Sequence, residues 1–398
     1  MRVRGCGRGD VGVRVKRSLG AVRIRLMTLA ILCIAGNTGH PEVCAQTAPD
    51  FPVANWQLVR PESEGYSSAR LESLRSWLAA GATTGMMVVV HGRMIFSYGD
   101  VARVSKIASV RKSILSMLYG SYVESGKINL SKTVEQLGLE EPDRPFLQIE
   151  KGATLEQLLS GRSGIYLLPA DVNIEKDAIA SSQPRRGTQY PGIYFHYNDW
   201  DFNAAGTAFE KLTGKDIYDA LETDLARPID MEDFDRRRQK KIVHEHESIH
   251  PEYAMYLSTR DMARLGLLML RNGNWNGKQL IPVTWVATSA SGTTPFEEMN
   301  PPFLRALGNP ERWGFGLMWW TWDAPVSPGG VYFTPFQGAY EARGTGGQYI
   351  TVITARDMVI VHKVDIDKDA HAAVVPEEWD AILNMVIASA CHGPCREK

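Results

Sequence analysis

The order in which strand-like and helix-like segments follow one another is the feature that most constrains the fold. Two apolar runs at 86–98, "MMVVV" and "MIFSY", are joined by the short connection "HGR" and predict a hairpin. From 109 to about 290 the apolar residues recur mostly with the period of an α-helix. The last third of the chain returns to strand-like runs, at 313–322, 348–353 and 358–364.

Two further helices are predicted at the ends of this pattern, at 67–81 and 377–390. The late strands are joined by short turns such as "TARD", and short turns join antiparallel strands. The simplest architecture is therefore an α+β fold over 61–390, an antiparallel sheet flanked by terminal helices. A helical subdomain is inserted over roughly 125–295.

The first 45 residues have the features of a secretory signal peptide. Basic residues up to Arg25 precede an apolar run at 26–36 and the small-residue cleavage site that ends at Ala45. We expect an exported protein, periplasmic or secreted after cleavage near Ala45, with a linker over 46–60. No later run reaches the roughly 18 apolar residues that a membrane span needs, so none is expected.

Charge and cysteine content limit the partners. A net charge of -1 over 398 residues gives no field to steer a polyanion, and the basic run "DRRRQKK" at 235–241 fits a solvated face, so no nucleic-acid partner is expected. Cleavage leaves only Cys391 and Cys395, in a tail over 391–398. They can pair in an oxidising compartment; the alternative, a metal site with the histidine between them, supplies few ligands.

The stretch "IASVRKSILSMLYG", residues 107–120, places Ser109 and Lys112 three apart at the start of a predicted helix. Residues at this spacing share one helix face, so Lys112 is expected beside Ser109. A serine hydroxyl needs a base to become a nucleophile, and the N–H groups at a helix start can bind a developing oxyanion. A helix-capping serine with an exposed lysine gives the same pattern, so the motif needs support from elsewhere.

Two other segments supply that support. The segment "YFHYNDWDFNAAG" contains Tyr197 and Asp199 ahead of a predicted helix, and "YEARGTGGQYITVI", residues 340–353, is a glycine-rich entry to a strand. In this order the three motifs resemble the serine hydrolases that group with class C β-lactamases, D-Ala-D-Ala carboxypeptidases, esterases and 6-aminohexanoate-dimer hydrolase.

The resemblance extends over roughly 60–390, because the segments at 154–165, 257–286 and 346–365 are also similar to parts of these hydrolases. It implies a β-lactamase/transpeptidase-like fold. It also implies an enzyme that needs no cofactor and acts on a small ester, amide or peptide-like substrate.

Carried over residue by residue, the resemblance implies that Ser109 is the acylated nucleophile. Lys112 and Tyr197 would move its proton, and the resemblance leaves open which of them is the base. The backbone N–H groups of Ser109 and Gln348 would form the oxyanion hole. Substrate would bind against the segment Thr345-Gly346-Gly347.

The sequence departs from the family pattern at two places. The tyrosine motif usually has an amide two residues on, where this chain has Asp199; that carboxylate would pair with Lys112 and hold it as an ammonium. The glycine-rich motif usually opens with Lys or His, where this chain has Thr345. Without a cation there, the site is not expected to recognise a substrate carboxylate, unless Arg343 supplies the charge. Uncharged acyl groups then suit the site better than an anionic β-lactam.

Other interpretations remain open. The segment "HEHESIH", with His244, His246 and His250, suggests a metallohydrolase but lacks the residues that complete a two-metal site. A catalytically silent binding protein on the same scaffold is the second alternative. Several tryptophans could line an apolar cleft, although any one of them is more often a core residue: Trp200, Trp313, Trp319, Trp320 and Trp322.

Overall fold

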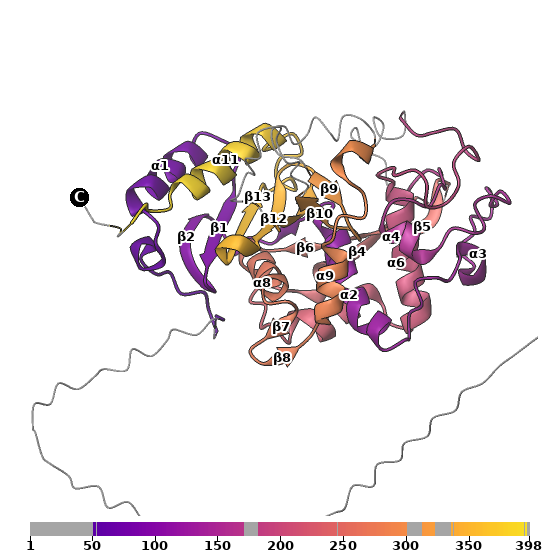
Figure 1. The fold of residues 1–398 in the computed structure, drawn as a ribbon, viewed down its shortest axis with the longest axis horizontal. Coiled ribbons are helices and arrows are strands. Elements are labelled where there is room, and N and C mark those ends of the chain that lie inside the picture. The colour runs from indigo at the N-terminus through magenta and orange to yellow at the C-terminus, as the bar shows by residue number, and fades with distance from the viewer. Residues whose placement is uncertain are drawn as a thin grey trace, which may run out of the picture. The chain divides into compact units, whose positions relative to one another are not determined.

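The computed structural model describes residues 51–52, 54–170, 182–244, 246–300, 313–322, 336, 338–393 and 395. The predicted signal peptide at 1–45 lies outside these residues. Within them, seven antiparallel strands form one sheet in the order β2-β1-β13-β12-β11-β10-β9 (Figure 1). Their bounds are β1 (Gly85–Val90), β2 (Arg93–Gly99), β9 (Trp313–Phe315), β10 (Trp320–Trp322), β11 (Tyr340–Gly344), β12 (Gln348–Ile353) and β13 (Met358–Lys363).

The strands from the two ends of the domain meet within this sheet, where β1 pairs with β13 as the second and third strands of the order. The predicted hairpin is present: β1 and β2 are joined by His91 and Gly92, whose φ angles of 51° and 77° suit a tight two-residue turn. The run 313–322 forms two short strands instead of one, because a turn with Met318 at φ 63° separates β9 from β10.

Helices cover both faces of the sheet. On one face α1 (Ser68–Leu78) and α11 (Pro376–Ala388) lie together (Figure 1). Trp379 of α11 stacks on Tyr349 of β12 with ring centroids 4.4 Å apart. On the other face α8 (Thr259–Leu270) packs against β12 and β13, and a Cβ atom at Gly266 would lie only 2.5 Å from Val359. This glycine therefore permits the close approach of α8 to the sheet.

The segment between β2 and β9 contains the predicted helical part. Its main elements are α2 (Val110–Glu124), α3 (Val134–Leu137), α4 (Leu155–Leu159), α6 (Asp199–Thr213), α7 (Ile217–Ala220), the π-helix η2 (Leu221–Ala226), α8 and α9 (Val283–Ser289). It also holds the strand pairs β3 (Ser105–Lys106) with β6 (Tyr256–Leu257), β4 (Lys240–His244) with β5 (Ser248–Ala254), and β7 (Asn274–Trp275) with β8 (Lys278–Gln279). Within the predicted range 125–295, α8 covers the sheet directly.

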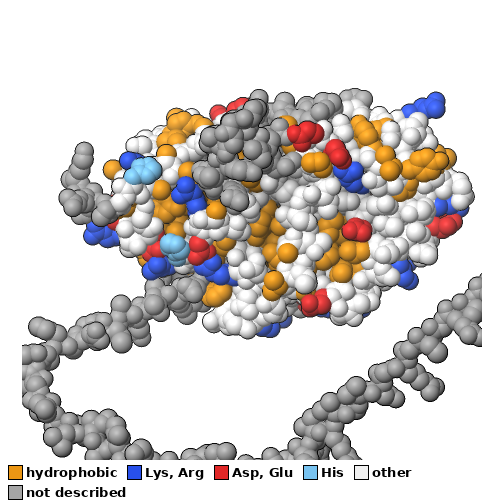
Figure 2. Space-filling view, in the orientation of Figure 1, with side chains coloured by type: hydrophobic (Ala, Val, Ile, Leu, Met, Phe, Trp, Pro, Cys, Tyr) orange, Lys and Arg blue, Asp and Glu red, His pale blue; other side chains and the backbone are white. Residues whose placement is uncertain are grey.

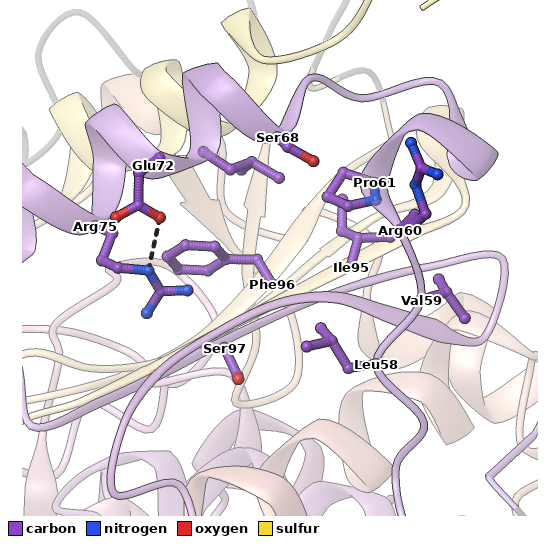
Figure 3. Close-up of a pocket in the computed structure, with 11 residues that line it drawn as sticks. Leu58, Val59, Arg60, Pro61, Ser68, Glu72, Arg75, Ile95, Phe96 and Ser97 are labelled. Carbon is purple, nitrogen blue, oxygen red and sulfur yellow. Dashed lines mark hydrogen bonds and ion pairs between the residues drawn. The ribbon is translucent and has the colours of Figure 1, made fainter. Parts of the chain in front are cut away.

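The described part of the predicted linker packs on the domain. The Trp56 indole donates a hydrogen bond to Arg260 O at 3.1 Å, and Leu58 forms an isolated β-bridge with Met94 of the edge strand β2. Between this segment, α1 and β2 lies a pocket of about 330 Å³, in which the Arg75 guanidinium covers the Phe96 ring (Figure 3). In the sheet, β2 is separated from β11 by three strands, so this pocket is remote from β11.

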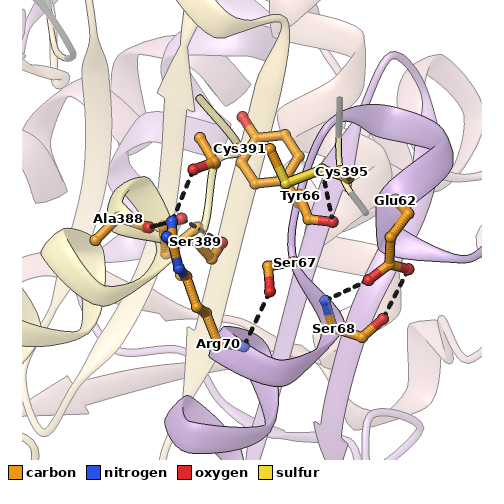
Figure 4. Close-up of a disulfide and its surroundings, with 11 residues drawn as sticks. Glu62, Tyr66, Ser67, Ser68, Arg70, Ala388, Ser389, Cys391 and Cys395 are labelled. Carbon is orange, nitrogen blue, oxygen red and sulfur yellow. Dashed lines mark hydrogen bonds between the residues drawn. A yellow bond between two sulfur atoms is a disulfide. The ribbon is translucent and has the colours of Figure 1, made fainter. Parts of the chain in front are cut away.

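The C-terminal tail is fastened to the start of α1 (Figure 4). Cys391 and Cys395 form a disulfide, as one of the two sequence interpretations predicted. The Cys391 N–H donates to Gly65 O at 2.8 Å, and the Arg70 guanidinium donates to Ala388 O at 2.8 Å. These contacts join the two ends of the domain.

None of the helices within the described residues combines the length and the apolar character that a membrane crossing requires. On the face shown in Figure 2, basic and acidic side chains are interspersed among apolar ones. This mixture agrees with the near-zero net charge of the sequence.

Candidate active site

Ser109 lies at the N-cap position of α2, as the sequence predicts. The short strand β3 pairs with β6 directly before it, and Ala108 between strand and helix has a φ of 45°. A positive φ is uncommon for alanine and stores strain in a sharp turn. As the N-cap residue, Ser109 has a backbone N–H that takes no part in the hydrogen bonds of the helix. The residue is half-buried.

Lys112 lies one helical turn after Ser109 and is 2% exposed, so the interpretation as an exposed lysine is wrong. Its Nζ donates to Ser109 Oγ at 2.9 Å and to Tyr197 Oη at 2.7 Å, and it forms an ion pair with Asp199. Two hydroxyl oxygens and one carboxylate oxygen therefore lie around the Lys112 ammonium, which has only N–H donors. This arrangement is the one expected for a protonated Lys112, as the presence of Asp199 predicts.

Tyr197 and Asp199 reach Lys112 from the start of α6. Asn198 caps this helix by accepting the Trp200 N–H, and its amide donates to Ile165 O at 2.6 Å. The two residues that flank Asn198 are thereby fixed next to α2. The Tyr197 ring is enclosed by the aromatic rings of Phe202, Phe315 and Trp320, with centroids 5.1, 5.9 and 5.8 Å away.

A buried polar network supports the Asn198 cap. Asp201 Oδ1 accepts hydrogen bonds from Ser163 Oγ at 2.7 Å and from Asn198 Nδ2 at 3.1 Å. Burial raises the pKa of the Asp201 carboxyl well above its usual value, although these hydrogen bonds act in the opposite direction. Asp201 therefore positions the cap and lies outside the group of residues that contact Lys112.

The glycine-rich segment approaches Ser109 through the last residue of β11. A Cβ atom at Gly344 would lie 3.1 Å from Ser109 N and 2.6 Å from Ile107 O, so only glycine allows this contact. Thr345 follows in an exposed turn, and Gly346 and Gly347 have φ angles of 82° and 99°.

Gln348, the predicted second donor of the oxyanion hole, lies across the turn on β12 and pairs with Gly344. It is fully buried, and its amide donates to Val364 O at 2.8 Å. The turn at 345–347 places Gln348 on the next strand, whereas Gly344 contacts Ser109 directly. Sequence order alone does not reveal where the turn begins.

Arg343, which the sequence suggested as the cation for a substrate carboxylate, is instead bound to other side chains of the protein. Its Nε donates to the buried Glu341, and its guanidinium packs over the rings of Trp313 and Trp320 at 4.7 and 5.1 Å. An arginine held in this way is neutralised locally, so it is a poor receptor for a substrate carboxylate.

The tryptophans are mostly core residues. Trp200 and Trp319 are at most 1% exposed, and the Trp200 indole donates to Glu141 at 2.8 Å, on the side of α6 that faces β5. Trp320 is the tryptophan that contacts the Tyr197 ring. An apolar wall next to Tyr197 is therefore built from Trp320 together with Phe315 and Phe202.

His250 of the histidine segment is a buried core residue. Both ring nitrogens of His250 are hydrogen-bonded, Nδ1 with Thr207 Oγ1 at 3.0 Å and Nε2 with Leu139 O at 2.6 Å, and the ring packs against Trp200. Among the described residues, no three His, Cys, Asp or Glu side chains come together as a metal-ion site requires. His250 would have to leave both partners to bind a metal.

The sequence interpretation missed Arg111, between Ser109 and Lys112. On a helix this position points away from Ser109, so the Ser109–Lys112 motif gives no reason to single it out. In the structure Arg111 is 2% exposed and is bonded to Asn203 and paired with Glu252. The first turn of α2 also contains Lys112 and Ser113, so the sequence carried no signal that set Arg111 apart from an exposed charge.

Comparisons with known proteins identify the family of this chain and its fold. The Beta-lactamase family model matches residues 77–377. A structure described as a 6-aminohexanoate-dimer hydrolase from Bacillus anthracis shares 22% identity, with 86% of this chain and 88% of that chain covered and a TM-score of 0.58. A beta-lactamase from Mycobacterium bovis shares 16% identity over 80% of this chain and 100% of that chain, with a TM-score of 0.54.

A third structure, of EstCE1, a hydrolase with promiscuous acyltransferase activity, shares 13% identity, with 83% and 99% of the two chains covered and a TM-score of 0.56. At these identities the likeness shows a common fold, the β-lactamase/transpeptidase-like fold predicted from the sequence. Because the family model matches well over half of its length, the chain belongs to the Beta-lactamase family of serine hydrolases.

Proposed function

We propose that this protein is an exported hydrolase that cleaves an ester or amide bond through an acyl-enzyme on Ser109, activated by Lys112 and Tyr197. The observation that carries the proposal is the position of Lys112 Nζ, 2.9 Å from the Ser109 hydroxyl and 2.7 Å from the Tyr197 hydroxyl. The three groups form one continuous path for a proton.

In acylation, Ser109 Oγ attacks the carbonyl carbon of the substrate. Its proton passes to Lys112 Nζ while another Lys112 proton passes to an ionised Tyr197, so the lysine keeps its charge throughout. Tyr197 then gives that proton to the leaving alcohol or amine as the bond to it breaks. Water attacks the acyl-enzyme by the same steps in reverse, and Ser109 regains its proton.

The tetrahedral intermediate needs donors for its oxyanion. One donor in our proposal is the Ser109 N–H at the start of α2. We place the second at the Thr345 N–H, because Gly344 directly before it abuts Ser109 N. This replaces the predicted donor, Gln348.

The substrate class follows from the charges around the site. Arg343 is paired with Glu341, Thr345 carries no charge, and the wall beside Tyr197 is aromatic. Uncharged acyl groups, as in short-chain esters or linear amides, fit this environment. Export is supported by the Cys391–Cys395 disulfide, since disulfides persist in oxidising compartments.

A fluorophosphonate probe tests the proposal, because it forms a stable bond only with an activated serine. Purified protein should be labelled on Ser109, and the Ser109→Ala variant should lose both labelling and ester turnover while its thermal unfolding stays unchanged. An unlabelled wild-type protein would instead favour the catalytically silent binding protein.

A further inference from the structure

We propose that His362 is the positioning residue that holds the glycine-rich turn at 345–347 in place beside Ser109. His362 lies on β13, is fully buried, and acts through the backbone of the turn. The inference rests on the proposed function and deepens it, because this turn carries the second N–H donor that we assign to the oxyanion.

The turn needs support from outside itself. Gly346 and Gly347 have φ angles of 82° and 99°, and glycine loses more conformational freedom on folding than any other residue. A donor for an oxyanion must be fixed before the reaction, because a group that has to reorganise stabilises the developing charge less. Hydrogen bonds from neighbouring segments are therefore needed to keep the turn in one conformation.

The backbone groups of both glycines are engaged in such bonds. Gly347 N–H donates to Gly344 O at 3.3 Å, within the turn, and Val374 N–H donates to Gly346 O at 3.3 Å. The Gly347 carbonyl is bonded by a side chain, with His362 Nδ1 2.6 Å from the oxygen. The bond from His362 is the shortest of these three.

The partners of the ring specify where its proton lies. A carbonyl oxygen only accepts, so Nδ1 of His362 carries the proton that is shared with Gly347. Burial lowers the pKa of His362 to about 4, so the ring is neutral at pH 7. Its Nε2 then accepts from the Thr83 hydroxyl at 2.9 Å. Thr83 thereby favours the tautomer that donates to the turn.

Packing keeps the ring from turning away from Gly347. His362 pairs with Tyr349 of β12, and its ring centroid lies 6.1 Å from that of Tyr349 and 5.3 Å from that of Trp379. The position of the Nδ1–H is thus set by the central strands and α11. Through this bond the rigid sheet fixes the turn.

The turn fills the space between Ser109 and the chain that follows β13. Gly344 abuts Ser109 N, whereas a Cβ atom at Gly346 would lie 2.7 Å from Ile366 and one at Gly347 would lie 3.0 Å from Val374. Without the bond from His362, the peptide after Gly347 can rotate and shift the N–H groups of the turn. A displacement of about 1 Å at a catalytic group can cost about 10²-fold in rate.

The test compares two amides at position 362, using kcat and KM for p-nitrophenyl butyrate. His362→Asn places its amide nitrogen near the position of Nδ1 and can still donate to Gly347 O. His362→Gln places its amide near Nε2, towards Thr83, and keeps more of the volume of the ring. We expect kcat to fall about 10²-fold in His362→Gln and to stay within about tenfold of the wild type in His362→Asn, with KM changed less than about twofold in both.

A purely structural role predicts the opposite order of the two variants. The shorter asparagine leaves the larger cavity, so it should have the lower melting temperature. If the residue acted only through stability, His362→Asn would then also have the lower activity. Only a specific bond to Gly347 makes the less stable variant the more active one.

Thr83→Val is the matched control. It removes the other hydrogen bond of the same ring and keeps the shape of the side chain, while Gly347 O still holds the proton on Nδ1. The melting temperature should fall, and kcat should stay within about twofold of the wild type.

Inhibition by n-butylboronic acid is the second measurement. Its tetrahedral adduct with an active serine places an oxygen where the oxyanion forms, so its inhibition constant should rise in parallel with the loss of kcat in His362→Gln. If His362→Asn does not fold, kcat and this constant in His362→Gln, set against Thr83→Val, decide the question.

Two outcomes overturn the role of His362 alone, in a protein whose wild-type Ser109 is labelled by fluorophosphonate. One is a His362→Gln variant with the kcat and boronate inhibition of the wild type. The other is a His362→Asn variant that folds and is less active than His362→Gln. A wild-type protein that is not labelled overturns the proposed function itself.

Discussion

Asp199→Asn is expected to move the acid limb of the pH–rate profile, which reports the ionisation of Tyr197 in the proposed mechanism, to lower pH. It removes the Asp199 charge that neutralises Lys112, so the Lys112 ammonium stabilises the Tyr197 phenolate more strongly. The two side chains are 2% and 7% exposed and in direct contact, so solvent screens their attraction little. An opposite charge at such a distance shifts a titration by about 1 to 3 units. We expect about 2 units here, or about 2.7 kcal/mol in the balance between the two protonation states.

The same substitution should lower the free energy of unfolding. Breaking a buried ion pair by removing one partner costs about 3 to 5 kcal/mol. The asparagine keeps the size of Asp199 and an oxygen that accepts from Lys112, so the loss should lie near the lower end, at about 3 kcal/mol.

The assay is kcat/KM for p-nitrophenyl butyrate across the acid limb, together with urea unfolding. At one pH unit below the wild-type midpoint, the variant should reach a fraction of its own plateau that is about tenfold larger than in the wild type. The control is Asp201→Asn, because burial raises the pKa of Asp201 and an asparagine mimics its neutral form. A limb that stays in place or moves up in Asp199→Asn, or that moves equally in Asp201→Asn, would refute the reasoning.

Four further outcomes are expected. Tyr197→Phe should lower kcat by about 10² to 10⁴-fold with little change in KM, since its hydroxyl carries the proton; an effect on KM alone would contradict this role. With Thr345 in place of a cation, kcat/KM for p-nitrophenyl butyrate should exceed that for nitrocefin at least about tenfold, and the reverse ranking would exclude the proposed acyl preference. Reduction of the Cys391–Cys395 disulfide, which joins residues four apart, should lower the free energy of unfolding by about 2 kcal/mol. Urea unfolding with and without reductant measures this loss, and an unchanged midpoint would show that the backbone contacts alone hold the tail in place. Burial lowers the pKa of His362 to about 4, so the unfolded chain binds a proton at this residue near pH 6.5 and the folded protein does not. The free energy of unfolding should therefore fall as the pH is lowered from about 6.5 to about 4. His362→Gln should lose less stability over this range than the wild type, and an equal loss would contradict the assignment.

The sequence by itself determined the elements whose signals are local. Two apolar runs around His91 and Gly92 specify a hairpin, because a two-residue turn with positive φ angles needs little else. The three-residue spacing of Ser109 and Lys112 specifies a shared helix face for the same reason. The order of strands and helices also sufficed to predict the α+β class, because the spacing at which apolar residues recur differs between a helix and a strand.

The tertiary structure alone decided which distant residues meet at Ser109. Periodicity shows which residues share a face, but it does not show what covers that face. The burial of Lys112 against Tyr197, 85 positions away, depends on how α6 docks against α2. The contact of Gly344, in place of Gln348, with Ser109 depends on the residue at which the β11–β12 turn begins. The burial of Arg111 likewise depends on partners from α6 and β5, because a charge can lie in the interior only where distant segments supply its counter-charge and hydrogen bonds.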